Sequence, residues 1–163
     1  MSLKNHLWLL CVPPLLAGCA RTVETQSARP APTAIMATAC STPDVTLDTE
    51  FLTGNIASCE PLGDTELSIS IEPEDAPPIN CSAWYAFRLT PQKAETVTVN
   101  LTYEHCGHRY WPKSSSDGIT WTDLPQDAVE VYEVDGVRQA RITLALADQP
   151  LFIAGQEIIS SVS

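Results

Sequence analysis

The chain has 163 residues, a length typical of one domain, and its 44% hydrophobic content is sufficient for a folded core. Twenty acidic residues against nine basic ones give a formal net charge of −11. This balance argues against a nucleic-acid partner, because binding to the phosphate backbone requires clustered lysine and arginine side chains. The acidity is expected to serve solubility.

The first segment, residues 1–18, is predicted to be a signal peptide for secretion. It contains one positive charge, Lys4, and continues with the apolar run LWLLCVPPLLAG. A membrane-spanning helix needs roughly 20 apolar residues. This run is shorter and is interrupted by Pro13 and Pro14, so an export signal fits it better than a membrane-spanning helix.

The sequence LAGC at residues 16–19 resembles the bacterial lipobox. The resemblance implies cleavage before Cys19, a diacylglycerol on its sulfur and an acyl chain such as palmitate on its new amine. Several acyl chains hold a protein on a membrane more firmly than one chain does. Ala20, where an aspartate could stand, implies the outer membrane of a Gram-negative bacterium, with the protein on the periplasmic face. The alternative is an ordinary signal peptide followed by a chance cysteine.

Residues 19–46 are predicted to form a flexible tether between the lipid and the folded domain. Alanine, threonine, serine and proline dominate this stretch, and large apolar side chains are few. Such a composition cannot bury enough surface to offset the entropy lost on ordering. The folded domain is therefore expected to occupy residues 47–163.

From residue 47 onward the sequence predicts an all-β fold, an antiparallel β-sandwich or jelly roll of about eight strands. Short apolar alternations are separated by turn residues, and no segment shows a sustained helical period. The expected pairs are residues 54–62 with 65–73, 81–90 with 96–104, the two halves of 114–124 around Asp117-Gly118, and 128–134 with 137–146 around Asp135-Gly136. Residues 150–160 are expected to form a last strand. The side chains expected to face the core are Leu67, Ile69, Ile71, Tyr85, Phe87, Leu89, Val97, Val99, Leu101 and Tyr103.

Four cysteines lie beyond the predicted lipid site: Cys40, Cys59, Cys81 and Cys106. An even number in an oxidising compartment predicts two disulfides, for which three pairings exist. The favoured pairing joins Cys81 with Cys106, which flank one predicted hairpin, and leaves Cys40 with Cys59. Side-chain alternation opposes this pairing, because Cys81 is in phase with the core-facing positions of its strand whereas Cys106 is out of phase on the next. Only a β-bulge would bring Cys81 and Cys106 to the same face, so the other pairings stay open.

The sequence contains no complete catalytic set. His105 and His108 resemble metal ligands in their spacing, but catalytic zinc needs three protein ligands, and Glu104 would face away from His105 on a strand. A Ser/His/Asp triad is not indicated, because no G-x-S-x-G motif occurs. We therefore predict no catalytic residue, no metal site and no cofactor.

Aromatic residues in the second half of the chain suggest a ligand site. The run SSSDGITW, ending at Trp121, resembles the S-x-DG-x-T-W hairpin of discoidin-type and other sugar-binding sandwiches. Trp121, Tyr110 and Trp111 are the candidate residues for stacking on a sugar ring. The alternative is that an aromatic side chain after the DG turn closes the core of its own hairpin.

Four stretches together resemble the N-terminal β-sandwich domain that precedes the catalytic domain in some bacterial zinc carboxypeptidases of the M14 type. They are FLTGNI at 51–56, WYAFRL at 84–89, HRYWPKSSSDGITWTDL at 108–124 and PLFIAGQEI at 150–158, so they span roughly residues 50–160. In that family an H-x-x-E pair and a distant histidine hold zinc in the following domain. Here neither His105 nor His108 begins an H-x-x-E sequence, so no peptidase residue is carried over to this chain.

The expected function is a non-catalytic binding or accessory module, held by lipid on the periplasmic face of the outer membrane. Its expected partners are the membrane and, by the resemblance, a carboxypeptidase catalytic domain or a cell-wall peptide. The alternatives are the front part of a zinc carboxypeptidase and a carbohydrate-binding module.

Overall fold

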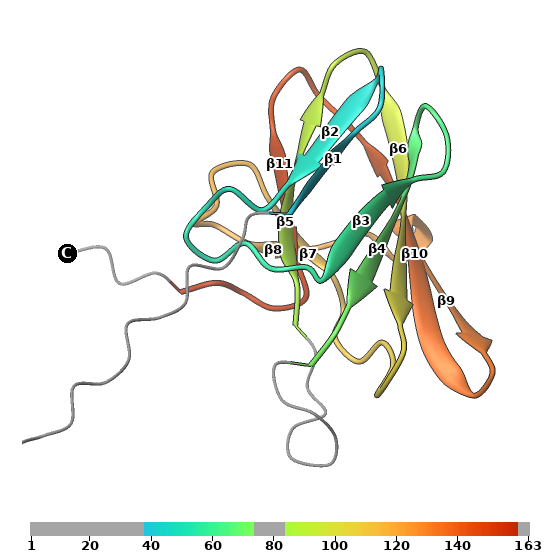
Figure 1. Ribbon diagram of the computed structural model, residues 1–163. Helices are drawn as coiled ribbons and strands as arrows, with labels where there is room; N and C mark the ends of the chain where they lie inside the picture. The colour runs from blue at the N-terminus through green and yellow to red at the C-terminus, as the bar shows by residue number, and fades with distance from the viewer. Residues whose placement is uncertain (1–37, 74–83, 160–163) are drawn as a thin grey trace, which may run out of the picture. The chain divides into compact units, whose positions relative to one another are not determined.

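Two β-sheets that lie face to face make up the fold (Figure 1). The computed structural model describes residues 38–73 and 84–159. Within these residues the chain forms eleven strands and one short 3-10 helix, η1, at Gln126–Ala128. The prediction of an all-β sandwich is therefore confirmed, with more and shorter strands than the eight or so expected. Within the same residues the structure has no helix with the length and hydrophobicity needed to span a lipid bilayer.

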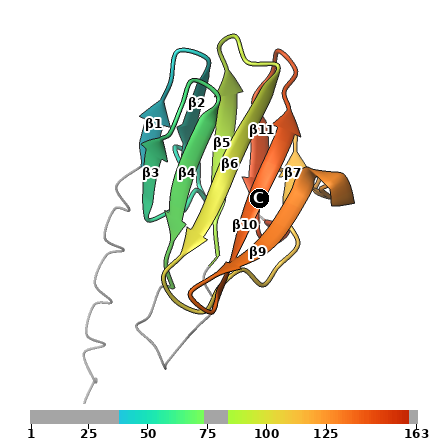
Figure 2. The same cartoon turned by 90° about the vertical axis from the view of Figure 1, so that its right-hand side faces the viewer.

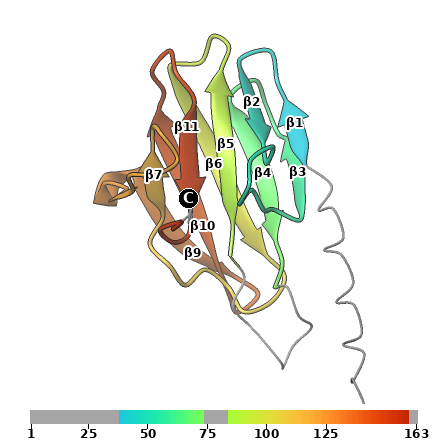
Figure 3. The ribbon, with the colours of Figure 1, turned by 90° about the vertical axis from the view of Figure 1, so that its left-hand side faces the viewer.

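The first sheet has six strands in the order β1-β2-β5-β11-β7-β8, all of them antiparallel to their neighbours. Strands β1, β2, β5, β11 and β7 of this sheet are labelled in Figure 3. Its strands are β1 (Ala39–Ser41), β2 (Val45–Asp48), β5 (Ala86–Pro91), β11 (Leu151–Ala154), β7 (Lys113–Ser115) and β8 (Thr122–Asp123).

The second sheet has five strands in the order β3-β4-β6-β10-β9, which lie side by side in Figure 2. Strands β4 and β6 are parallel, and the other pairs are antiparallel. Its strands are β3 (Ser58–Pro61), β4 (Glu66–Ile71), β6 (Thr96–Tyr103), β10 (Val137–Ala145) and β9 (Val129–Val134).

Three of the four predicted strand pairs are present. Strand β3 pairs with β4, β7 with β8 and β9 with β10, all antiparallel. The β9–β10 turn contains Asp135 with φ 51° and Gly136 with φ 81°. Positive φ at both central positions is the geometry that favours Asp-Gly in two-residue hairpins, so this local signal predicted the turn correctly.

The predicted hairpin between residues 81–90 and 96–104 is wrong. Strand β5 belongs to the first sheet and β6 to the second, so the connection between them crosses from one sheet to the other. This connection is held by the carbonyl of Asp44, which accepts hydrogen bonds from the N–H groups of Gln92, Lys93 and Ala94 at 2.8–3.1 Å. Side-chain alternation fixes which residues face the core, but it does not say which sheet a strand joins.

The predicted tether extends too far along the chain. Strand β1 and the first two residues of β2 lie inside the predicted segment 19–46, yet they form the edge of the first sheet. Val45 and Leu47 on β2 are fully buried. Thr38, the first described residue, is held by a hydrogen bond from its N–H to Thr49 Oγ1 at 2.8 Å. Averaged over residues 19–46, the composition is poor in large apolar side chains, so it did not reveal the short apolar alternation of β2.

The core lies between the inner faces of the two sheets. Every side chain predicted to face inward is buried, and Leu67, Ile69, Phe87, Leu89, Val97, Val99 and Leu101 have no exposed surface. Strand β4 shows the pattern directly, because its alternate residues Ser68 and Ser70 are only partly buried. Alternation of period two thus predicted the inward faces correctly even where the strand partners were wrong.

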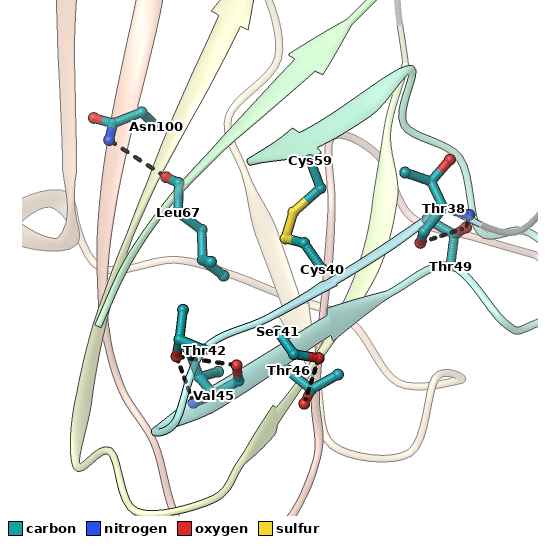
Figure 4. Close-up of a disulfide and its surroundings, with 10 residues drawn as sticks. All are labelled: Thr38, Cys40, Ser41, Thr42, Val45, Thr46, Thr49, Cys59, Leu67 and Asn100. Carbon is teal, nitrogen blue, oxygen red and sulfur yellow. Dashed lines mark hydrogen bonds between the residues drawn. A yellow bond between two sulfur atoms is a disulfide. The ribbon is translucent and has the colours of Figure 1, made fainter. Parts of the chain in front are cut away.

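A disulfide between Cys40 and Cys59 joins the two sheets at one edge (Figure 4). Cys40 lies on β1 and Cys59 on β3, the outermost strands of the two sheets on this side. Their Cα atoms are 5.7 Å apart. This member of the favoured pairing is therefore confirmed. Cys106 is also disulfide-bonded, but Cys81 lies outside the described residues, so the second pair stays a prediction.

Removing the described disulfide should destabilise the sandwich. The cysteines are 19 residues apart in sequence, and a cross-link over a loop of this length lowers the entropy of the unfolded chain enough to stabilise the fold by about 3 kcal/mol. The double variant Cys40→Ala/Cys59→Ala should lose about this amount of unfolding free energy, measured by urea denaturation. Ser58→Ala, at an exposed neighbouring position, is the control. A double variant as stable as the control would contradict the stabilising role.

Candidate binding site

A pocket of about 430 Å³ lies at the end of the first sheet where β7, β8 and the segment after β11 meet. This volume is within the range of small-molecule binding sites, but two other surface pockets have volumes of about 420 Å³, so it is the aromatic and charged lining that distinguishes this pocket. We call it the aromatic pocket, and its lining residues are Tyr110, Trp111, Lys113, Asp123, Gly155, Gln156 and Glu157.

Strand register brings the charged side chains of the aromatic pocket together. Lys113 on β7 lies directly opposite Asp123 on β8 and also pairs with Ala154 on β11. Residues directly opposite each other in antiparallel strands project from the same face of the sheet. Glu157 follows β11 by three positions and approaches the same lysine. The hairpin and the end of β11 therefore build the pocket jointly.

One ammonium group lies between two carboxylates in this pocket. Lys113 Nζ donates a hydrogen bond to Asp123 Oδ1 and lies 3.8 Å from Glu157 Oε1. The hydrogen bond to Asp123, with the negative charges of both carboxylates, raises the pKa of Lys113 above its usual value. Lys113 is therefore positively charged at neutral pH. The lysine side chain is 22% exposed, whereas those of Asp123 and Glu157 are 65% and 62% exposed.

Two of the three predicted aromatic residues line the pocket. Tyr110 and Trp111 come from the segment between β6 and β7. The indole Nε1 of Trp111 donates a hydrogen bond to the carbonyl of Leu124 at 2.8 Å, and the N–H of Leu124 donates to the carbonyl of Pro112 at 2.9 Å. The first bond orients the indole ring, and the second holds Leu124 against the segment that carries Trp111.

Trp121 is not among the residues that line the aromatic pocket. Its ring nitrogen is buried, and within the described part of the chain it has no hydrogen-bond partner. Two of the three predicted aromatic residues therefore line the aromatic pocket, and Trp121 does not. Lys113, Asp123 and Glu157 were not predicted as site residues.

The loop that resembles a sugar-binding hairpin uses its polar groups internally. Asp117 Oδ1 accepts hydrogen bonds from the N–H groups of Ile119 and Thr120 at 2.8 and 2.7 Å and from Ser115 Oγ at 2.8 Å. These donors stabilise the ionised carboxylate, so they hold the pKa of Asp117 well below its usual range. Gly118, with φ 72°, completes the turn. The SSSDGIT sequence is thus explained by the folding of the loop itself.

The two histidines of the domain lie in different environments. His105 is exposed, whereas His108 is 3% exposed and its Nδ1 lies 3.2 Å from the hydroxyl of Tyr103. Cys106 and Gly107 between them have φ values of 67° and 65°, so the chain turns sharply between the histidines. Within the described ranges no group of three or more His, Cys, Asp or Glu side chains could hold a metal ion.

Burial makes His108 neutral. Desolvation, with the positive charge of Arg138 as a second cause, lowers its pKa from 6.5 to about 4. The backbone N–H of His108 donates to the carbonyl of Arg138 at 2.7 Å, which places the histidine against the start of β10. Protonation would place a positive charge on the buried His108 side chain, where the positive charge of Arg138 also acts on it.

Comparisons with known proteins give a structural similarity but no match to a family or a curated protein. No protein-family model matches the chain, and no curated protein matches it. Among solved structures, the fold is similar to part of a putative carboxypeptidase A from Shewanella denitrificans, with a TM-score of 0.48 and 24% sequence identity. The similarity covers 66% of this chain and 28% of that protein. This chain therefore spans much less than two thirds of the similar protein.

Acid should destabilise the sandwich in part through His108. Because its pKa is lower in the folded state than in the unfolded state, the stability tied to neutral His108 is present above pH 6.5 and is lost as pH falls toward about 4. The full loss of unfolding free energy over this pH range is about 3 kcal/mol. His108→Gln should flatten the pH dependence of the unfolding free energy in this window, measured by urea denaturation at several pH values. His105→Gln, at the exposed histidine, should retain the original slope; equal slopes in all three proteins would refute the assignment.

Proposed function

We propose that this chain is an exported lipoprotein whose sandwich acts as a non-catalytic binding or accessory module. A lipid on Cys19 would hold it on the periplasmic face of the outer membrane of a Gram-negative bacterium, and the chain between Cys19 and Thr38 would form the tether. The observation that carries the binding role is the aromatic pocket, in which a fixed indole ring and three charged side chains converge on one volume.

The arrangement of polar groups supports binding rather than catalysis. A nucleophile needs a base within hydrogen-bonding distance, and the base needs an orienting partner. In the described part of the chain, buried His108 contacts Tyr103, and the buried serine Ser115 donates to Asp117 rather than to a histidine. Lys113 is charged at neutral pH through its bond with Asp123, so it is unsuited to act as a base there.

Export is supported by the cysteine chemistry. The disulfide between Cys40 and Cys59 is of the kind that persists in oxidising compartments such as the bacterial periplasm. The sequence of residues 16–19, with its resemblance to a lipobox, adds the lipid attachment site. Together these features support an outer-membrane lipoprotein more than a cytoplasmic protein.

A carboxypeptidase catalytic domain is the proposed protein partner, and a cell-wall peptide is the proposed alternative ligand. The support is the sequence resemblance of residues 50–160 to the domain that precedes such a catalytic domain. The second candidate function, the front part of a zinc carboxypeptidase, rests on the same resemblance. The reading frame beyond Ser163 decides between them, since an H-x-x-E sequence there would establish the enzyme.

The lipid anchor can be tested with one substitution. Cys19→Ser should abolish incorporation of labelled palmitate and move the protein from the membrane fraction to the soluble fraction, because the thiol that carries the diacylglycerol is lost. Cys11→Ser, in the predicted signal peptide, is the matched control and should remain labelled. Palmitate incorporation into the Cys19→Ser variant would disprove the assignment.

The non-catalytic role has a separate test. The purified chain should not cleave C-terminal residues from peptides, with or without added zinc, since the residues that the structure describes hold no metal-binding group. Zinc-dependent release of a C-terminal amino acid, abolished by a chelator, would contradict this role.

A further inference from the structure

We infer that the aromatic pocket binds a neutral polyhydroxylated ring, the sugar unit of a glycan. This inference rests on the proposed role as a binding module and names the ligand class of its pocket. It depends on the charge arrangement around Lys113 and on the indole of Trp111, whose ring nitrogen is hydrogen-bonded, in the lining of one pocket.

The charges in the pocket disfavour ionic ligands of either sign. An anion attracted to Lys113 would also approach the exposed carboxylates of Asp123 and Glu157. A cation would compete with the lysine ammonium for the same carboxylate oxygens, and like charges in close proximity repel each other. A neutral ligand avoids repulsion by the carboxylates and by the ammonium group.

Hydroxyl groups match the hydrogen-bonding capacity of the pocket. Ionised carboxylates only accept hydrogen bonds and an ammonium group only donates them, whereas a hydroxyl group does both. A ring with adjacent hydroxyls can donate to Asp123 or Glu157 and accept from Lys113 at the same time. Hydrogen bonds to charged groups are stronger than those between neutral groups. The three charged side chains therefore suit a polyol.

The aromatic side chains suit the apolar faces of the same ligand. Tyr110 and Trp111 line the pocket beside the charged residues. Because the bond from Trp111 Nε1 to Leu124 already fixes the indole, little conformational freedom remains to be lost on binding. Rigid aromatic surfaces next to polar groups contribute contact area at low entropic cost. A ring with C–H groups on one face and hydroxyls at its edge meets both requirements.

The test uses the full chain, purified in a detergent without a sugar headgroup. Binding is measured by tryptophan fluorescence and calorimetry with three uncharged oligosaccharides, which are tetra-N-acetylchitotetraose, cellotetraose and maltotetraose. The charged comparators are the deacetylated cationic form of chitotetraose and anionic tetragalacturonic acid, and tetra-alanine is the peptide probe. We expect at least one uncharged sugar to bind with a Kd below about 1 mM and more tightly than both charged sugars.

Variants locate the binding at the pocket. Tyr110→Ala, Asp123→Asn and Glu157→Gln should each weaken binding of the preferred sugar by about tenfold, because the first removes a stacking surface and the other two replace a charged acceptor with a neutral amide. The matched controls are Tyr132→Ala on β9 and Glu60→Gln on β3, both in the second sheet, and they should bind as the unaltered chain does. Circular dichroism and the melting temperature establish that each variant is folded. Glu157→Gln, at an exposed position, keeps the test valid if another variant unfolds.

Several results would overturn the inference. They are an absence of binding by all three uncharged sugars at about 10 mM, tighter binding of either charged sugar, and unchanged affinity in folded Tyr110→Ala and Glu157→Gln variants. Binding of tetra-alanine without sugar binding would overturn the ligand class and leave the binding module in place. The palmitate experiment tests the lipoprotein assignment independently of all these outcomes.

Discussion

The burial of one face of each sheet against the other is the constraint on which the structure depends. Inward-facing side chains alternate along the strands of both sheets, and the central ones have no exposed surface. The disulfide between Cys40 and Cys59 closes the sandwich at the edge formed by β1 and β3. The first sheet ends on its other side in the short strands β7 and β8, and the aromatic pocket lies there. One edge is thus covalently joined, and the other carries the candidate binding site.

Local sequence patterns predicted the inward faces and the turns but not the complete topology. Alternation identified Leu67, Ile69 and Ile71 on β4, and Asp135-Gly136 identified the β9–β10 turn, because both features depend on neighbours in sequence. The assignment of β5 and β6 to different sheets depends on long-range packing, which the alternation does not encode. The parallel pairing of β4 with β6 has the same origin and was not predicted.

The candidate site was predicted in its aromatic part and missed in its charged part. Tyr110 and Trp111 are conspicuous in the sequence because aromatic side chains have the apolar faces on which a sugar ring can stack. Lys113 and Asp123 could have been found, since they are equidistant from Gly118 in the predicted hairpin and carry opposite charges. No local pattern indicated Glu157, because its approach to Lys113 follows from the pairing of β11 with β7. The zinc-like spacing of His105 and His108 misleads, since a sharp turn separates an exposed side chain from a buried one.

The position of the disulfide also has a mechanical consequence. Cys40 lies on the first strand, immediately after the part of the chain that leads back toward Cys19. A pulling force applied to the N-terminal segment reaches β1 and, through the sulfur bridge, the edge strand of the opposite sheet. The load is shared by hydrogen-bonded strands of both layers, so β1 cannot be peeled away alone while the bridge is intact. Tension arriving from the N-terminal side is therefore borne first by the covalently joined edge of the sandwich.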